Sequence, residues 1–545
     1  MYKYNTDDTQ FLVERVDQFE KQLKRYLVGD LDDAKFKSLR LRNGVYMELH
    51  AHMLRVAIPY GVMNSKQLIA LADVADKYDR GFGHFTTRQN IQFNWIEVAE
   101  IANLLRELSS VDLHAIQTSG KTTRNITADP LSGLTEGEIA DARPYCELIR
   151  RWFNLHPEFS WLPGKFKIAV NGAKLDETAL RIHDLGLRLL RNDKGELGFS
   201  VYVGGGLGAV AVIGSETASF VPVEDILSYL ESVMRVYNLK GRRDNIKRLR
   251  IKFLVKELGA AEFSRLVDED WKHTKNDPEL KLNINHLAQL EKDFALPVKP
   301  LEIDRFEEPV DFNYSIWKKN NVRAHKLSGY SIVNVSLTKQ GSSPGDVTSK
   351  QMRILADLAD QYSNSYLRTT KRQSIVFPHV RKDQVFDLWQ SLEEFSLASP
   401  HQGTLAQIVA CPGNDYCDLA KAASIPIATR VQQRFDDMDK MLDIGDLNIN
   451  ISGCENSCAH HHIADIGLLG MKKNNVEFYQ ITVAGETLNE TVIGKKLGRS
   501  ICGDEIVDAI ENIVNVYLEN RDEEEQFKEV FKRIGLAPFK ERVYD

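Results

Sequence analysis

The sequence predicts an α+β protein made of two similar halves, and three observations support this. First, residues 65–93 (SKQLIALADVADKYDRGFGHFTTRQNIQF) are repeated without a gap at residues 349–377 (SKQMRILADLADQYSNSYLRTTKRQSIVF). Second, the register continues after a shift of three, because residues 167–173 (KIAVNGA) match residues 448–454 (NINISGC). Third, residues 296–312 contain three prolines between the halves, which is typical of an extended connection.

The elements of each copy follow from its hydrophobic pattern. Leu and Ala at helical spacing predict a helix at the start, and the alternation in RQNIQF and RQSIVF predicts a strand. Arg88 in the first copy falls on Arg372 in the second, and a strand ending at Val203 falls on one ending at Ala484. We therefore expect both halves to combine helices with strands.

The composition of the 545 residues narrows the class of protein. The length predicts two to four domains, and 43% apolar with 27% charged residues is ordinary for a globular enzyme. A net charge of -7 gives no reason to expect a nucleic acid or membrane partner. The first residues are charged, with no apolar export segment, and no apolar run approaches the roughly 20 residues that cross a bilayer. We expect a cytoplasmic protein, in which disulfides are rare.

Four of the six cysteines form two close pairs in the last quarter of the chain: Cys411 and Cys417, then Cys454 and Cys458. Structural zinc sites usually pair cysteines at shorter spacing than the first pair shows. An iron–sulfur cubane also takes four thiolates and tolerates irregular spacing. Spacing alone favours the cluster but leaves zinc and unligated thiols open.

The other cysteines and the neighbouring histidines are not expected to bind metal. Cys146 and Cys502 stand alone, which favours buried small side chains. Consecutive side chains cannot all face one metal ion, so His460–His462 are interpreted as polar surface residues or as residues supporting the site.

A glycine run and five basic residues in the first half suggest an anion site. VGGGLG at residues 203–208 lacks the dinucleotide-binding spacing, but its free backbone N–H groups could hold anions. The basic residues lie beside expected strands or small residues: Arg55, Arg88, Arg124, Lys165 and Lys167. In a strand, the two lysines would share one face, and two neighbouring cations favour an anion between them.

Together these motifs carry a family likeness. The Cys-x5-Cys and Cys-x3-Cys pairs, preceded by TTRQ, TSG…RN and KFK, resemble the sirohaem-containing sulfite and nitrite reductases. The likeness runs from about residue 40 to the end and is greatest to the haemoprotein (beta) component of assimilatory sulfite reductase.

The resemblance implies two cofactors, a [4Fe–4S] cluster and sirohaem. It implies that Cys411, Cys417, Cys454 and Cys458 hold the cluster and that Cys458 also ligates the sirohaem iron. It implies that the residues holding sirohaem are Thr86, Arg88, Gln92, Gly204, Gly205, Gly206, Asn456 and Cys458. The implied substrate pocket consists of Arg55, Arg124, Lys165 and Lys167, with the lysines as proton donors.

The resemblance also implies a domain plan. Two ferredoxin-like half-domains (1–110 and 313–400) and two α+β domains (111–295 and 401–545) surround a central cofactor cleft. The first α+β domain binds sirohaem and the anion, the second carries the cysteines, and residues 296–312 form the crossover linker.

The expected activity is assimilatory sulfite reduction, the six-electron conversion of sulfite to sulfide in sulfate assimilation and cysteine biosynthesis. The nitrite branch commonly has asparagine at the position of Lys167, so the two lysines favour sulfite; reduction of nitrite to ammonia is the alternative. A relative that oxidises a corrin precursor and a non-catalytic zinc-binding scaffold are remoter alternatives. The electron donor is expected to be ferredoxin or an NADPH-dependent flavoprotein component.

Overall fold

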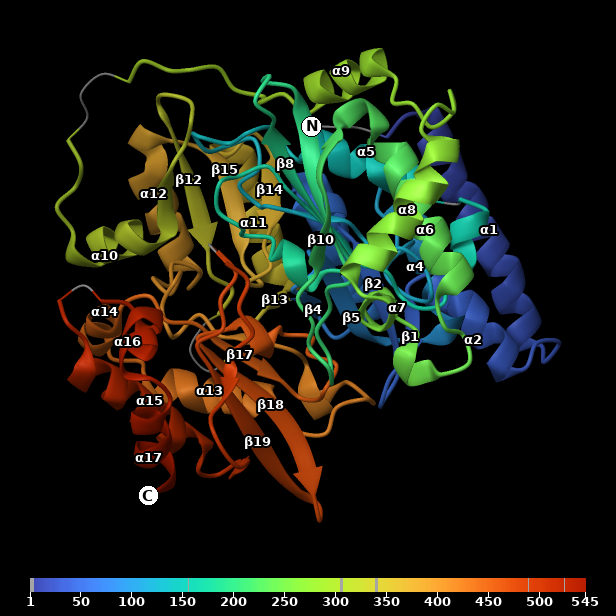
Figure 1. The fold of residues 1–545 in the computed structure, drawn as a ribbon. Helices are drawn as coiled ribbons and strands as arrows, with labels where there is room; N and C mark the ends of the chain where they lie inside the picture. Colours follow the sequence, from blue (N-terminus) through green and yellow to red (C-terminus); the bar gives the residue numbers. More distant parts are fainter. Residues whose placement is uncertain (1–3, 155, 304–306, 339–341, 489, 524) are drawn as a thin grey trace.

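The computed structural model describes residues 4–154, 156–303, 307–338, 342–488, 490–523 and 525–545. Helices surround four sheets, and the C-terminal sheet and its helices form the red and orange part of Figure 1. The sheets form two pairs with matching strand orders. The predicted internally duplicated α+β fold is therefore confirmed.

The first pair of sheets exchanges one strand between the halves. The sheet of the first half has the order β1-β2-β5-β4-β13, in which β13 comes from the second half. Its strands are β1 (Val45–Met47), β2 (His52–Ala57), β5 (Asn90–Ile96), β4 (Phe82–Phe85) and β13 (Asp346–Thr348). The other sheet has the order β11-β12-β15-β14-β3, in which β3 comes from the first half. Its strands are β11 (Val322–Ala324), β12 (Tyr330–Val335), β15 (Ile375–Arg381), β14 (Tyr366–Thr369) and β3 (Val62–Asn64).

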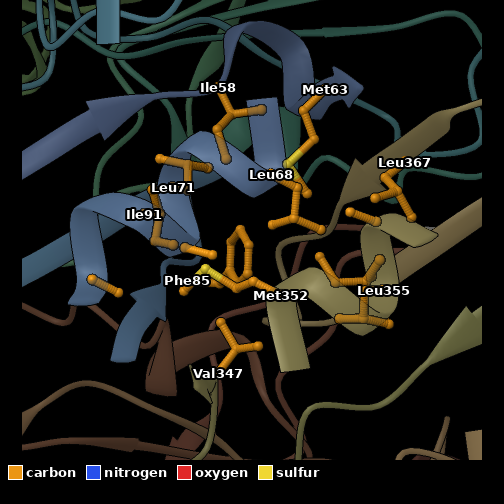
Figure 2. Packing of buried hydrophobic residues seen from close by; sticks show 14 of the residues in the cluster. Ile58, Met63, Leu68, Leu71, Phe85, Ile91, Val347, Met352, Leu355 and Leu367 are labelled. Carbon is orange, nitrogen blue, oxygen red and sulfur yellow. The ribbon is translucent and has the colours of Figure 1, made fainter. Parts of the chain in front are cut away.

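The helices of the repeat, α3 (Ser65–Tyr78) and α11 (Ser349–Tyr362), begin in the same way. Each has a capping box, in which the N-cap side chain and a glutamine three residues later satisfy each other's backbone N–H groups. The repeated Ser-Lys-Gln is therefore a helix start signal. The two helices pack against each other in one shared core, where Leu71 of α3 and Leu355 of α11 are fully buried (Figure 2). This core ties the halves into one body.

Two buried glutamines fix the turns that lead to β5 and β15. Gln89 and Gln373 both have positive φ, and each donates a hydrogen bond to a backbone carbonyl of the opposite half. A Cβ on Gly61 would lie 2.5 Å from the Gln89 amide, and one on Gly345 would lie 2.6 Å from that of Gln373. Both glycines also have positive φ. Glycine is therefore required at both positions, by the close approach of the glutamine amide and by the backbone conformation.

The second pair of sheets carries the candidate site. The strands of the first are β6 (Thr127–Ala128), β7 (Ile168–Asn171), β8 (Leu185–Arg191), β9 (Leu197–Val203) and β10 (Ser215–Pro222). Those of the second are β16 (Val409–Ala410), β17 (Ile449–Ser452), β18 (Ile466–Lys473), β19 (Val476–Val483), β20 (Lys495–Lys496) and β21 (Ile501–Cys502). In both sheets the first three strands run parallel and the next is antiparallel.

The remaining helices pack around both pairs of sheets. In the first half they are α1 (Thr6–Leu27), α2 (Asp33–Arg42), α4 (Ile101–Ser109), α5 (Arg143–Phe153), α6 (Ile226–Lys240), α7 (Ile251–Leu258), α8 (Ala260–Thr274) and α9 (Ile284–Asp293). In the second they are α10 (Phe312–Asn321), α12 (Val385–Glu394), α13 (Ile425–Arg434), α14 (Met438–Ile444), α15 (Ile506–Asn520), α16 (Phe527–Ile534) and α17 (Ala537–Tyr544). Within the described ranges, no helix combines the length and apolar character needed to cross a membrane.

The segment expected as a linker, residues 296–312, lies between α9 and α10. Its described residues before Phe312 form neither helix nor strand, and residues 304–306 lie outside the described part of the chain. Figure 1 shows the described residues of this segment running along the edge of the molecule.

Candidate active site

The four clustered cysteines lie in loops at the ends of short strands in the C-terminal sheet. Cys411 follows β16 and Cys454 follows β17, and these two parallel strands are hydrogen-bonded neighbours. The Cys411 thiol accepts a hydrogen bond from Gly453 N–H at 3.2 Å. Cys458 is exposed, whereas Cys411 and Cys417 are half-buried.

The thiols influence one another electrostatically. Burial raises the pKa of Cys411 to about 11, and Cys458 adds to the shift. Burial raises the pKa of Cys417 to about 12, with further contributions from Glu48, Cys458 and Cys411. In the described part of the chain, however, no three His, Cys, Asp or Glu side chains are close enough to bind a single metal ion. Four neighbouring thiols at wider spacing suit the separate corners of a cubane cluster, each bound to its own iron.

The cysteine loop meets the first half beside the predicted anion site. Thr87 donates a hydrogen bond from Oγ1 to the Cys458 carbonyl at 2.7 Å. A Cβ on Gly208 would lie 3.6 Å from the Glu455 carbonyl. The TTRQ turn and the glycine turn of one half therefore contact the cysteine loop of the other, where Asn456 is exposed.

Arg55 and Arg124 meet at a tyrosine that sequence reasoning missed. Arg55 binds the Gln92 amide oxygen through Nε and Nη2, at 3.0 and 2.7 Å, and donates from Nη1 to the Tyr46 hydroxyl at 3.2 Å. Arg124 donates to the Thr118 carbonyl at 2.9 Å, and its Nη1 lies 3.5 Å from the same hydroxyl. Burial would raise the pKa of Tyr46, but Arg55 and Arg124 outweigh it and lower the value to about 7. The pocket thus holds a phenol that ionises near neutral pH.

Lys165 and Lys167 precede strand β7 and flank the buried ring of Phe166. Burial lowers the pKa of Lys165, and Arg124 and Arg250 add to the shift. Burial also lowers the pKa of Lys167, with added repulsion from Lys165, Arg88 and Arg250. In both cases Cys458 has a smaller opposite effect on the pKa. The two lysines are therefore unusually ready to release a proton.

Arg88 and Thr86 lie in the turn before β5. The Thr86 hydroxyl accepts hydrogen bonds from the backbone N–H groups of Arg88 and Asn90. Arg88 Nη2 donates to the Asn125 carbonyl at 2.5 Å, but its buried Nη1 has no hydrogen-bond partner among the described residues, and the same is true of Arg124 Nε. Burying a charged donor without a partner is costly, so these atoms indicate room for an anionic group.

The glycine run does not present the free N–H groups that the sequence suggested. Gly204 donates to the Asp184 carbonyl at 3.0 Å and Gly206 to the Val212 carbonyl at 2.9 Å, so that prediction was wrong for both residues. Close packing requires the glycines instead. A Cβ on Gly205 would lie 2.2 Å from the Arg181 carbonyl, and one on Gly206 would lie 2.7 Å from the Arg250 guanidinium.

The buried Lys252 stabilises the glycine turn through hydrogen bonds to its carbonyl groups. This lysine is only 3% exposed and donates to the carbonyls of Gly206, Leu207 and Val210, at 3.3, 2.8 and 2.5 Å. Replacement by methionine should leave these carbonyls without their donor and destabilise the fold by about 1.5 to 3 kcal/mol. We expect thermal unfolding to show a melting temperature lower by a few degrees for Lys252→Met. Lys256→Met, at an exposed position on the same helix, should leave it unchanged; equal losses in both variants would contradict the role of Lys252.

The histidines after Cys458 are not surface residues, which corrects one of the two interpretations from sequence. His461 is fully buried and lies 3.2 Å from the Ser457 hydroxyl, and His460 is also buried. His462 lies 3.2 Å from the Gly208 carbonyl and so contacts the glycine turn. Of the two lone cysteines, Cys146 is buried as expected, whereas Cys502 is half-buried.

Sequence reasoning also missed an ion pair that supports the lysine segment. Arg250 binds Asp184 through Nε and Nη2, at 3.0 and 2.8 Å, and Asp184 accepts the Lys167 N–H at 2.9 Å. The only signal in the sequence was Asp184, which falls on Asp465 in the repeat.

Two pairs of thiols that influence one another, beside a group of basic residues, fit a redox enzyme that acts on a small anion. Comparison with known families agrees. The nitrite and sulphite reductase 4Fe-4S domain matches residues 119–275 and 402–545, and the nitrite/sulfite reductase ferredoxin-like half domain matches residues 48–111 and 338–395. The chain belongs to the nitrite and sulfite reductase family.

Individual relatives include both kinds of reductase. The chain is 26% identical over 496 residues to "Sulfite reductase [ferredoxin] 2" of Mycolicibacterium paratuberculosis, covering 88% of this chain and 82% of the relative. It is 27% identical over 477 residues to "Ferredoxin--nitrite reductase" of Synechococcus elongatus, covering 85% of each. The structure of the Mycobacterium tuberculosis NirA protein has the same fold, with a TM-score of 0.80 at 24% identity over 98% of this chain and 97% of that one.

The protein is accordingly an oxidoreductase with a [4Fe–4S] cluster and sirohaem. Its residues fit both groups. Four thiols from neighbouring loops are available to the cluster, and the Arg88 Nη1 atom, which has no partner among the described residues, suits a carboxylate of sirohaem.

Proposed function

We propose that the protein is an assimilatory sulfite reductase that reduces sulfite to sulfide at its sirohaem. The observation that carries this proposal is the pair Lys165 and Lys167, which flank buried Phe166 before β7 and whose pKa values are lowered by burial and by Arg250. A sulfite anion bound there would meet two fixed cations and two acidic ammonium groups.

We assign two roles, substrate binding and proton transfer, to the residues of the pocket according to their chemistry. Guanidinium groups such as those of Arg55 and Arg124 bind oxyanion oxygens through paired N–H groups. We assign them to substrate binding, with the Tyr46 hydroxyl holding both guanidinium groups in place. We assign proton transfer to Lys165 and Lys167, because a lowered pKa makes an ammonium a better acid.

The reaction needs this supply of protons. Converting SO₃²⁻ to HS⁻ and three waters takes six electrons and seven protons, and each of the three S–O bonds breaks as its oxygen leaves in water. The cluster and the sirohaem supply the electrons when bound. The lysines would protonate the departing oxygens and recover their protons from solvent.

We assign the cofactor contacts as the motifs suggest. Cys411, Cys417, Cys454 and Cys458 would hold the cluster, with Cys458 shared with the sirohaem iron. The residues assigned to sirohaem are Thr86, Arg88, Gln92, Gly205 and Asn456, and Gly204 and Gly206 shape the turn rather than donate to the cofactor. Because Gln92 already accepts from Arg55 through its oxygen, its amide N–H₂ is the group available to sirohaem.

Reduced ferredoxin is the proposed electron donor, and the cytoplasm the proposed location. The relatives of both kinds are named for ferredoxin, which favours it over an NADPH-dependent flavoprotein component. Ferredoxin should then support turnover that NADPH with a flavoprotein does not.

Nitrite is the second candidate substrate, because nitrite reductases are as similar to the chain as sulfite reductases. The deciding measurement is kcat/KM for sulfite and for nitrite with reduced methyl viologen, using protein that contains sirohaem. A ratio favouring sulfite, with sulfide as the sole product, supports the proposal. A ratio strongly favouring nitrite would overturn it and assign the enzyme to nitrogen assimilation.

A further inference from the structure

A second pocket with basic side chains lies in the C-terminal half, and its lining extends to His460, two residues after Cys458. It is a cavity of about 50 Å³ beside β16 and β17, and its lining includes Lys371, Arg372 and Lys528. About 10 to 15 Å³ admits one water molecule, so this cavity has room for the few heavy atoms of a small oxyanion.

The duplication makes this pocket the counterpart of the active-site pocket. Arg372 falls on Arg88, and Asn448 falls on Lys167. The supporting contacts are repeated as well. Asp465 accepts the Asn448 N–H at 3.0 Å and lies 3.6 Å from the Lys528 ammonium, as Asp184 accepts the Lys167 N–H and binds Arg250.

Two sequence differences from the active-site half make this pocket too small for a macrocycle. Glu486 and Thr487 stand where the active-site half has Gly205 and Gly206, so side chains occupy the space above the turn. Residues 173–177 match the Cys454–Cys458 loop, and Asp176 N–H donates to the Leu488 carbonyl at 2.8 Å. The loop thus closes over the pocket without bringing a cysteine.

Within the described part of the chain, neither Lys371 nor Arg372 forms an ion pair, although Glu486 is among the residues that line the pocket. The Lys371 ammonium has one long hydrogen bond to a described residue, 3.4 Å to the Thr487 hydroxyl. The Arg372 guanidinium makes no hydrogen bond or ion pair with any residue that the structure describes. Glu177 is the main carboxylate acting on Lys371, followed by Asp176 and Asp129, but none of them forms an ion pair with it.

We propose that this pocket binds a small tetrahedral oxyanion, inorganic phosphate or sulfate, between Lys371 and Arg372. A compact anion with several oxygens would satisfy the ammonium and the guanidinium together. The site is independent of the assigned redox activity.

The test is calorimetric titration of the cofactor-containing enzyme with phosphate, and separately with sulfate, at constant ionic strength. Phosphate that enters the active site should change the sirohaem absorption, whereas binding in the second pocket should not. We expect one saturable event without a spectral change, and the tighter of the two anions identifies the ligand.

Two substitutions with opposite expected effects make the test specific. Arg372→Gln should weaken this event by at least about tenfold, the size of one charge-assisted hydrogen bond. Glu177→Gln should tighten it severalfold, because it removes a carboxylate that acts on both cations. Arg25→Gln, an exposed charge-matched control on α1, should change nothing. The proposal is overturned if no such event occurs, or if Arg372→Gln and Arg25→Gln have equal affinities.

Discussion

Replacement of Cys458 by serine is expected to lower turnover with sulfite by at least about a thousandfold, or about 4 kcal/mol of activation free energy. Cys458 is the thiol that influences the other cysteines and both pocket lysines, so it links the proposed cluster to the proposed substrate site. Serine is a poor substitute because iron–sulfur clusters are held by thiolates. The measurements are methyl viologen-driven turnover, iron content and the visible spectrum.

The matched control is Cys502→Ser. Cys502 is half-buried in β21, a strand separate from the cysteine loops, and its replacement should leave iron content and turnover unchanged. Retention of full iron content and turnover by Cys458→Ser would exclude the proposed shared ligand. Loss in both variants would indicate general damage to the C-terminal sheet.

The fold was predictable where the chain repeats itself. The Ser-Lys-Gln start of each copy forms a capping box, and the alternating RQNIQF and RQSIVF segments lie at β5 and β15. The exchange of β3 and β13 between the halves was not predictable. These strands have three residues each, too few to show an alternating pattern, and only long-range pairing defines them.

The site was predictable where its residues lie in short motifs. The cysteine pairs, TTRQ and KFK are local, and the structure brings them together at the contact of Thr87 with Cys458. Tyr46 and Arg250 are isolated in the sequence, and their importance arises from partners that the fold supplies: Arg55 and Arg124 for one, Asp184 for the other.

The histidine and glycine interpretations failed for a related reason. The polar side chain of His461 suggests exposure to solvent, but in the interior of the protein the Ser457 hydroxyl serves as its hydrogen-bond partner. Gly204 and Gly206 suggest free N–H groups, but neighbouring carbonyls already accept them. Whether a polar group is free depends on its tertiary neighbours, which a local motif does not specify.

Replacement of Lys167 tests the other central assignment, that of proton transfer. Lys167→Met should lower kcat/KM for sulfite by about 10² to 10⁴, the usual contribution of a general acid. The fold should tolerate the change, because burial and three cationic neighbours already disfavour the charged lysine. Lys174→Met, at an exposed position in the same half, is the matched control and should retain full activity.

Lys167→Arg separates charge from proton supply. Arginine keeps the positive charge but holds its proton at any working pH, so KM should change little while kcat falls. The pH profile gives an independent signature. The ammonium is the acid, so wild-type kcat should fall as pH rises through the lowered pKa of Lys167, and this limb should be absent in the arginine variant. Wild-type kcat in Lys167→Arg would show that the residue contributes charge alone, leaving Lys165 as the proton donor.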